Sequence, residues 1–214
     1  MKKVVVVGAG GFGREVIEIF KDENKIKEKW NILGFIDDNS DLHGSKINGF
    51  PVLGGTDWLI ENHNDEIGGV IAIGEPKIKK IIADKLENGK VKFVNAIHPS
   101  VIMGDYIELG KDVIICAGSI LTVNIKICNH VIININSTIG HDTVIDDYCS
   151  IMPTVKINGN NNLREGVYVG TGAAFIHQVS VGKWTTIGAG AVVVNDIPES
   201  VVAVGVPAKV IRKS

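Results

Sequence analysis

The sequence is poor in cysteine and has no CxxC spacing, which argues against a disulfide framework and the common zinc motifs. Its cysteines, Cys116, Cys128 and Cys149, are predicted to be reduced, buried thiols. The formal net charge is only −2, so the charge balance does not favour nucleic acid or an anionic membrane. No apolar run approaches the roughly 18 residues of a membrane span, and the apolar stretch after Met1 is too short for a signal peptide. We therefore expect a cytoplasmic protein without membrane insertion.

A six-residue repeat runs through the second half of the chain. Every sixth residue from Ile97 to Val193 is apolar, a period that fits neither an α-helix nor a simple strand. A second set, from Val101 to Ala191, is mostly small or β-branched and suits a narrow interior. Gly, Asp or Asn often follows the apolar residue, as at Gly140, and we expect it to supply the permissive backbone of a corner. The repeat predicts a triangular β-solenoid with three hexads in each coil.

The first part of the chain has a different pattern. A β-branched run at residues 4–7 precedes a glycine-rich loop and a helical stretch at residues 14–21. Further strands are expected at residues 32–36 and 70–73, the second of them followed by the start of another helix. Alternating strands and helices of this kind predict an α/β unit with a parallel sheet.

The spacing of Gly8, Gly10 and Gly13 satisfies the dinucleotide-binding fingerprint. A complete dinucleotide fold needs two three-stranded halves, and fewer than 100 residues precede the repeat, so one mononucleotide is the better fit. The loops after the three strands should converge, with backbone N–H groups for an anion and with Asp37 or Asp38 for a ribose or base. Glycines that merely permit a tight turn are the alternative.

The glycine loop, the hexads and the closing segment VGVPAKV at residues 204–210 together resemble the hexapeptide-repeat sugar acyltransferases. That family is typified by sialic acid O-acetyltransferase and by the UDP-4-amino-sugar N-acetyltransferases of bacterial surface-glycan pathways. The resemblance implies a left-handed β-helix, acetyl-CoA as co-substrate, and a homotrimer with sites between neighbouring subunits. It divides the chain into a Rossmann-like nucleotide-sugar-binding domain, residues 1–96, and a left-handed β-helix acyltransferase domain, residues 97–214.

The resemblance also implies where the acceptor, a nucleotide sugar or a sialic acid, binds. Three segments match the positions at which relatives hold the sugar nucleotide: the glycine loop, the end of the second strand and the end of the third. The expected substrate-binding residues are Gly10, Gly11, Phe12, Gly13, Asp37, Asp38, Ala72, Ile73 and Gly74. Phe12 either stacks on a sugar or base or simply covers the sheet.

Acyl transfer from a thioester needs a base for the attacking group and a donor for the developing oxyanion. Within its hexad, His141 should project from a corner, and Asp142 could fix its tautomer through one ring nitrogen. The same pair is the family's catalytic signature. One coil later, Gly159 leaves space beside His141 and offers a backbone N–H to the thioester oxygen. An ordinary exposed surface histidine is the alternative.

By analogy with the family, acetyl-CoA should lie along the later coils. The expected contacts are Gly159, Gly172, Ala173, His177, Gly188, Ala189 and Lys209. Where many relatives carry a second histidine, this chain has Ser150, which leaves one contact to substrate or acetyl group in doubt. Asn161 at an inward position and Arg164 at a corner predict a locally irregular coil.

The expected reaction is N-acetylation of a UDP-4-amino-sugar by direct attack, with His141 as general base. O-acetylation of a sialic acid or another sugar is the close alternative, and a non-catalytic sugar-nucleotide-binding scaffold is a more remote one. A zinc enzyme of the carbonic anhydrase type would need three suitably spaced histidines, which His141 and His177 do not complete, so no metal is expected.

Overall fold

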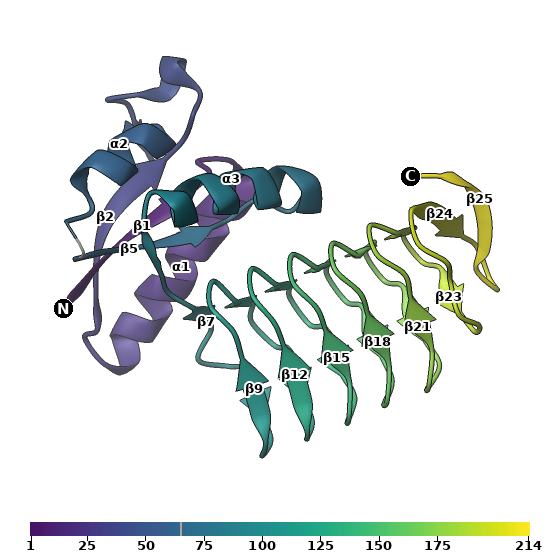
Figure 1. Cartoon of the computed structure of the whole chain (residues 1–214). Helices are drawn as coiled ribbons and strands as arrows, with labels where there is room; N and C mark the ends of the chain where they lie inside the picture. The colour runs from purple at the N-terminus through teal and green to yellow at the C-terminus, as the bar shows by residue number, and fades with distance from the viewer. Residues whose placement is uncertain (65) are drawn as a thin grey trace.

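The computed structural model describes residues 1–64 and 66–214 and shows an α/β unit at one end of a long coil (Figure 1). Among the described residues, the α/β unit contains three helices, one short 3-10 turn and a six-stranded sheet. Its elements are β1 (Lys2–Val7), α1 (Gly11–Ile26), β2 (Trp30–Ile36), the 3-10 turn (Ser40–Leu42), β3 (Lys46–Ile47), β4 (Phe50–Gly54), α2 (Thr56–Asn62), β5 (Ile67–Ile71), α3 (Pro76–Asn88) and β6 (Lys92–Phe93).

The sheet has the strand order β3-β4-β2-β1-β5-β6 and is parallel except for the β3–β4 pair. Side chains of β1 alternate between its two faces, as the strand period requires. Val4 and Val6 pack with α1, whereas Val5 and Val7 pack with residues of α2 and α3. Helices on both faces confirm the Rossmann-like half-domain predicted from the sequence. The third strand, β5, ends at Ile71, two residues earlier than expected.

The solenoid as a whole, which we call the coil, has three faces, each made of short parallel strands. A single coil, as in "the next coil", is one turn of it. The first face contains β7 (Ala96–Ile97), β10 (Ile114–Ile115), β13 (Ile132–Ile133), β16 (Ser150–Ile151), β19 (Tyr168–Val169), β22 (Thr186–Ile187) and β24 (Val201–Val204), and β25 (Lys209–Lys213) joins it antiparallel. The second contains β8 (Ile102–Met103), β11 (Ile120–Leu121), β14 (Thr138–Ile139), β17 (Lys156–Ile157), β20 (Ala174–Phe175) and β23 (Val192–Val193). The third contains β9 (Ile107–Leu109), β12 (Ile125–Ile127), β15 (Val144–Ile145), β18 (Asn162–Leu163) and β21 (Ser180–Val181).

Strand pairing confirms the predicted repeat. Ile115 pairs with Ile133, and Ile133 with Ile151, so each coil advances by three hexads. The apolar residues at the hexad position point inward and form one continuous core along the coil. This part of the chain is the expected left-handed β-helix. Its first strand, β7, begins at Ala96, the last residue of the expected first domain.

The corner glycines serve a different purpose from the one predicted. The left-handed backbone falls two residues later, at positions such as Asp142 (φ 58°) and Asn160 (φ 59°). Gly140 and Gly170, which directly follow the inward apolar residue, are absent from the positive-φ positions. A Cβ on either would overlap backbone of the next coil, so these glycines permit close stacking of coils.

The irregular coil predicted around Asn161 is also wrong, because the neighbouring strands pair in register. The inward amide of Asn161 is fully buried and hydrogen-bonded on both sides. Its Nδ2 donates to the carbonyl oxygens of Asn158 and Ile176, and its Oδ1 accepts from the Val179 N–H. Since every strong polar group is paired, the residue fits the apolar interior without distorting the coil. Arg164 at its corner extends outward towards Asp146.

Candidate active site

The loops that follow β1, β2 and β5 meet at one edge of the α/β sheet, and we call them the loop cluster (residues 8–10, 37–39 and 72–75). The Ala9 N–H donates to Asp37 Oδ2 at 2.9 Å, which joins the first two loops. A Cβ on Gly8 would contact Ile73 and the Ala72 carbonyl, so the first and third loops are also adjacent. The predicted convergence at the carboxyl ends of the strands is therefore present in the structure.

The two predicted acidic residues hold these loops in shape. Asp37 accepts a second backbone N–H, from Asn39, at 2.9 Å. Asp38 Oδ1 accepts from both the N–H and the hydroxyl of Thr56, at 2.7 and 2.9 Å, at the start of α2. His43, which sequence analysis did not select, places Nε2 2.7 Å from the Asp37 carbonyl oxygen. Its position after a 3-10 turn gave no sequence signal, because the contact depends on how that turn folds back.

The glycines of the fingerprint separate into two groups. A Cβ on Gly13 would overlap the Gly8 carbonyl, so this glycine allows α1 to pack closely against β1. Gly10 faces open space, and Gly11 has only the Arg14 side chain nearby. Phe12 is half-buried and packs against the core beside α1. The open backbone at the start of α1 is therefore the part of the loop available to a ligand.

The coil contributes to the space beside the loop cluster. A cleft of 430 Å³ is lined by Gly74, Glu75, Met152, Tyr168 and Thr186. The last three belong to the first face of the coil or the corner after it, and Met152 comes close to Gly74. Sequence analysis missed them because they look like ordinary outward residues of the repeat, and only the docking of the two parts brings them to the cleft.

His141 lies at a corner between the second and third faces, on a cleft of 410 Å³ that Gly140, Gly159 and His177 also line. Its side chain is 61% exposed. His141 Nδ1 lies 2.7 Å from Asp142 Oδ2, and Asn124 Nδ2 donates to the other oxygen at 3.3 Å. The hydrogen bond with His141 is the main reason that the pKa of Asp142 lies below its usual range. The structure thus brings together His141, Asp142, Gly159 and His177, with the imidazole Nε2 open to a ligand.

The remaining predicted cofactor residues lie at a different edge of the coil. Gly172, Ala173, Gly188 and Ala189 follow strands of the first face, at the corner that leads to the second face. Lys209 is exposed on β25, at the end of the first face. Within one chain these residues are separated from His141 by the width of the second face.

Ser150, where a contact to substrate was in doubt, is fully buried on the first face. Its hydroxyl oxygen accepts a hydrogen bond from Lys79 of α3 at 2.9 Å, so it faces the α/β unit instead of an open groove. In residues 1–64 and 66–214, no group of three or more His, Cys, Asp and Glu side chains is placed to hold a metal ion. None of the helices in this same part of the chain is long and apolar enough to span a membrane.

Comparison with known proteins places these features in a family. Residues 3–86 match the PglD N-terminal domain. GDP-perosamine N-acetyltransferase of Escherichia coli O157:H7 is 30% identical over 98% of this chain and 96% of its own length. A mutant of perosamine N-acetyltransferase from Caulobacter crescentus, in complex with CoA and GDP-perosamine, superposes with a TM-score of 0.90 at 30% identity, covering 98% of this chain and 97% of that one. The acetyltransferase domain of PglB from Neisseria gonorrhoeae FA1090, in complex with acetyl coenzyme A, gives 0.89 at 29% identity, covering 98% and 99%. The chain therefore belongs to the sugar acetyltransferases of the hexapeptide-repeat family.

Proposed function

We propose that this protein transfers the acetyl group of acetyl-CoA to the amino group of a nucleotide-linked amino sugar in the cytoplasm. One observation carries the proposal: the loop cluster and the His141 cleft occur in a chain that matches a GDP-perosamine N-acetyltransferase over nearly its whole length. The UDP-linked acceptor expected from sequence and a GDP-linked one like that of the relative are both candidates. The nucleotide lies against the loop cluster of residues 1–96, and the chemistry takes place on the coil of residues 97–214.

The proposed substrate contacts come from the residues predicted from the sequence, except Phe12 and Gly13, which pack within the α/β unit. The nucleotide phosphates lie against the backbone of Gly10 and Gly11, where open space and the start of α1 favour an anion. Asp37 and Asp38 hold the loops that surround the ribose or base, and their carboxylates keep lone pairs for a ligand hydroxyl. The sugar extends past Ala72, Ile73 and Gly74 into the 430 Å³ cleft beside Met152 and Tyr168. Phe12 supports the sheet under this loop.

The chemical step is a direct attack. His141 Nε2 takes a proton from the sugar amine as the nitrogen attacks the acetyl carbonyl carbon, which gives a tetrahedral intermediate. The C–S bond then breaks, and the CoA sulfur leaves with the proton from His141 as the thiol. Asp142 holds the other ring nitrogen and stabilises the imidazolium that forms between the two steps. An aspartate is ionised at neutral pH, and the hydrogen bond with His141 lowers the pKa of Asp142 further.

Gly159 supplies the oxyanion donor. Its N–H donates no hydrogen bond within the described residues, and a Cβ on this glycine would meet the His141 ring. A backbone donor held by a rigid coil needs no reorganisation as negative charge develops on the thioester oxygen. Acetyl-CoA runs from this point onto the first-face corner of a neighbouring copy, against Gly172, Ala173, Gly188 and Ala189 of that copy, with His177 at the mouth of the cleft and Lys209 of the neighbouring copy near the CoA phosphates.

The cysteines support direct attack over an acetyl-enzyme. Burial raises the pKa of the Cys116 and Cys149 thiols to about 12, and burial also raises the pKa of Cys128. Thiols that stay protonated are poor nucleophiles. None of the three lines the His141 cleft.

The separation of His141 from the loop cluster points to a site shared between subunits. The loop cluster and the Gly188 corner lie on or beside the first face, whereas His141 lies at the far edge of the second. A neighbouring copy that brings its His141 corner to the first face completes the site, and repeating that contact closes a cyclic assembly. We propose the homotrimer that the family resemblance implies.

The test is an acetylation assay with acetyl-CoA and a panel of UDP-, dTDP- and GDP-linked amino sugars and free sialic acids. We expect CoA release only with amino sugars and a product whose acetyl group resists hydroxylamine, as an amide does. A hydroxylamine-labile product would identify O-acetylation instead. Binding of nucleotide sugars, with no CoA released from acetyl-CoA in the presence of any of them, would identify a scaffold and overturn the proposal.

A further inference from the structure

Both ends of the third loop of the loop cluster, residues 72–75, are tied to the coil by buried charged groups. The loop begins directly after Ile71 of β5 and ends at Glu75, the N-cap residue of α3. Asp112 of the coil binds the strand before the loop, and Lys79 in the first turns of α3 binds the coil after it. Both side chains are almost completely buried, at 1% and 0% exposed.

Asp112 accepts a backbone N–H of β5 that has no partner in the neighbouring strand. In the ladder with β1, the Ala72 N–H donates to Val7 O, so the N–H of Ile71, one residue earlier, points to the other side of β5. The neighbour on that side, β6, pairs only with Gly68 and Gly69. Asp112 Oδ1 accepts the Ile71 N–H at 2.8 Å beyond the end of β6. The carboxylate therefore holds the last residue of β5 against the coil.

Lys79 ties the other end. Its Nζ donates to Ser150 Oγ at 2.9 Å and to the Cys149 carbonyl at 3.2 Å, both on or next to the first face. That carbonyl already accepts the Ile132 N–H of the coil ladder, so Lys79 is not needed to complete the coil. Burial lowers the pKa of Lys79 to about 8, while the nearby Asp112 opposes this shift. Burying an apolar side chain here would cost less free energy than burying an amine. This indicates that the hydrogen bonds of Lys79 have a role beyond filling space.

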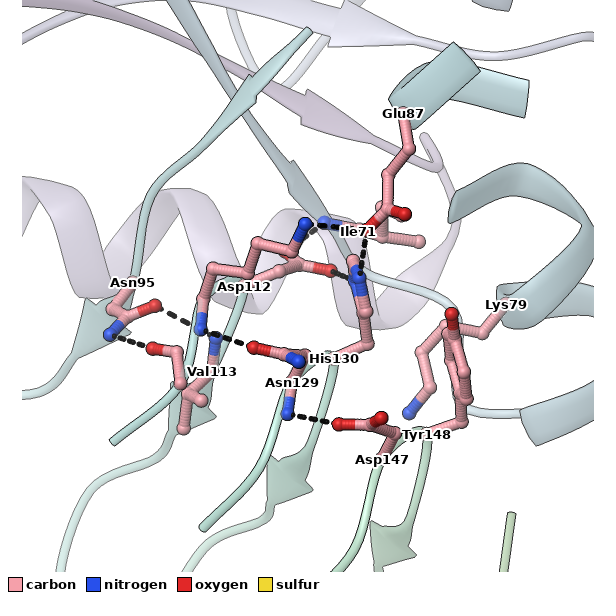
Figure 2. Close-up of polar contacts among 12 residues, drawn as sticks. Ile71, Lys79, Glu87, Asn95, Asp112, Val113, Asn129, His130, Asp147 and Tyr148 are labelled. Carbon is pink, nitrogen blue, oxygen red and sulfur yellow. Dashed lines mark hydrogen bonds and ion pairs between the residues drawn. The ribbon is translucent and has the colours of Figure 1, made fainter. Parts of the chain in front are cut away.

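Asp112 is itself fixed by its neighbours (Figure 2). Its Oδ2 lies 2.8 Å from His130 Nδ1, and His130 Nε2 lies 3.0 Å from Glu87 at the end of α3. The His130 ring stacks on Tyr148 of the next coil at 5.0 Å and 3°. Lys111 also reaches Glu87, at 2.7 Å. Asp112 thus belongs to a polar cluster between the α/β unit and the corner that joins the third face of the coil to the first, and Lys79 lies close enough to feel its charge.

We propose that Asp112 and Lys79 are positioning residues for acetyl transfer, which fix the sugar-binding end of the loop cluster relative to the coil. This inference rests on the proposed function. If the base comes from a neighbouring subunit, the attachment of the α/β unit to its own coil, together with the contact between subunits, determines where the amine arrives. Loss of a tether lets residues 72–75 shift while their ligand contacts stay intact. A misplacement near 1 Å costs about 100-fold in rate.

The test compares Lys79→Met, Asp112→Ala and the milder Ser150→Ala with wild type, using the full chain and its best amino-sugar nucleotide. Lys85→Met is the matched control, because Lys85 is an exposed residue of the same helix paired with Asp57 at the surface. The measurements are kcat per folded enzyme, Kd values for the nucleotide sugar and CoA, and hydrogen exchange of the peptide covering residues 70–77. We expect kcat to fall about 10- to 100-fold in Lys79→Met and Asp112→Ala, with both Kd values within about threefold of wild type and faster exchange in that peptide. Ser150→Ala, which keeps the Cys149 contact, should show a smaller loss of the same kind.

Two results would overturn the inference. Unchanged kcat in all three variants would show that the cluster only contributes stability, and a parallel loss of nucleotide-sugar binding would show that it shapes the ligand contacts themselves. If Lys79→Met or Asp112→Ala fails to fold, Ser150→Ala and the variant that folds decide on the same criteria. A wild-type enzyme inactive with every amino sugar would refute the proposed function instead, and the exchange data would still report whether the tethers hold the loop.

Discussion

The imidazole of His141 lies directly beside Gly159 of the next coil, so closely that a Cβ on Gly159 would overlap the ring around Nε2. The nitrogen on the opposite side of the ring, Nδ1, is engaged by Asp142 at 2.7 Å. One ring nitrogen is therefore held by a carboxylate, while a residue without a side chain keeps the space beside the other. A base that must accept a proton from a bound amine needs both conditions.

Replacement of His141 by Ala should abolish most of the acetyl transfer. General base catalysis contributes about 10²–10⁴-fold, so kcat should fall by that order while nucleotide-sugar binding stays intact. CoA release followed with a thiol reagent measures the rate, and calorimetry measures the binding. Asp105→Ala, two coils earlier in the same column and exposed, is the control. Undiminished turnover in His141→Ala would remove the histidine from the mechanism.

A methyl group at Gly159 should disturb the base without unfolding the coil. The His141 side chain is exposed and can rotate away from an alanine at this position, so the melting temperature should change by only a few degrees. The rotated ring and the altered approach to the Gly159 N–H should lower kcat about 10- to 1,000-fold. Steady-state kinetics beside thermal unfolding separates the two effects. A variant that retains wild-type kcat would show that neither space nor donor at Gly159 is used.

The architecture of the coil was predictable because each hexad places an apolar residue at the same inward position. An uninterrupted apolar period from Ile97 to Val193 leaves little choice but stacked coils. The strand, glycine loop and helix around Gly10 likewise identify the α/β half. The handedness came from resemblance to a family, since the periodicity itself is the same for either hand. The regular path at Asn161 was missed because its amide satisfies the backbone of two coils at once.

The site was predictable only in its separate pieces. His141 and Gly159 are one coil apart, so counting along the repeat places them together. Met152 and Asp112 could not be found in this way, because their roles depend on how the α/β unit docks on the first face. That docking is set by long-range contacts that no local pattern encodes.

The fingerprint glycines should respond differently to alanine. At Gly13 the added methyl group meets the Gly8 carbonyl, so the free energy of unfolding should fall by about 2 kcal/mol or more. At Gly10 it meets open space, so stability should change by less than about 1 kcal/mol while nucleotide-sugar affinity drops. Urea unfolding and ligand titration test both variants. Equal destabilisation in the two would mean that Gly10 serves the fold instead of the ligand.

The buried Lys79 should give the protein a distinctive alkaline stability profile. Below pH 8 the amine is charged in both the folded and unfolded chain, and the full cost of burying that charge is present. Between about pH 8 and 10.5 the folded chain has released the proton and the unfolded chain still binds it, so rising pH favours the folded state. The difference in unfolding free energy between wild type and Lys79→Met should therefore shift towards wild type across this interval. A Lys79→Met curve parallel to that of wild type would contradict a lowered pKa for Lys79.

Complementation between two inactive variants tests whether the site is shared. His141→Ala lacks the base but keeps its loop cluster, whereas Gly10→Phe fills the open space beside the loop cluster and keeps its base. In a cyclic trimer that takes these parts from adjacent subunits, every mixed assembly contains one intact site. Random mixing at equal amounts should therefore restore about a quarter of wild-type activity. Co-expression with two affinity tags, followed by tandem purification, isolates the mixed assemblies for assay, and these should show about a third of wild-type activity because one site of three is intact. If one chain supplied both His141 and the loop cluster to a site, every site in a mixed assembly would still carry one of the two defects. Mixed assemblies as inactive as either parent would therefore show that both parts of a site come from the same subunit.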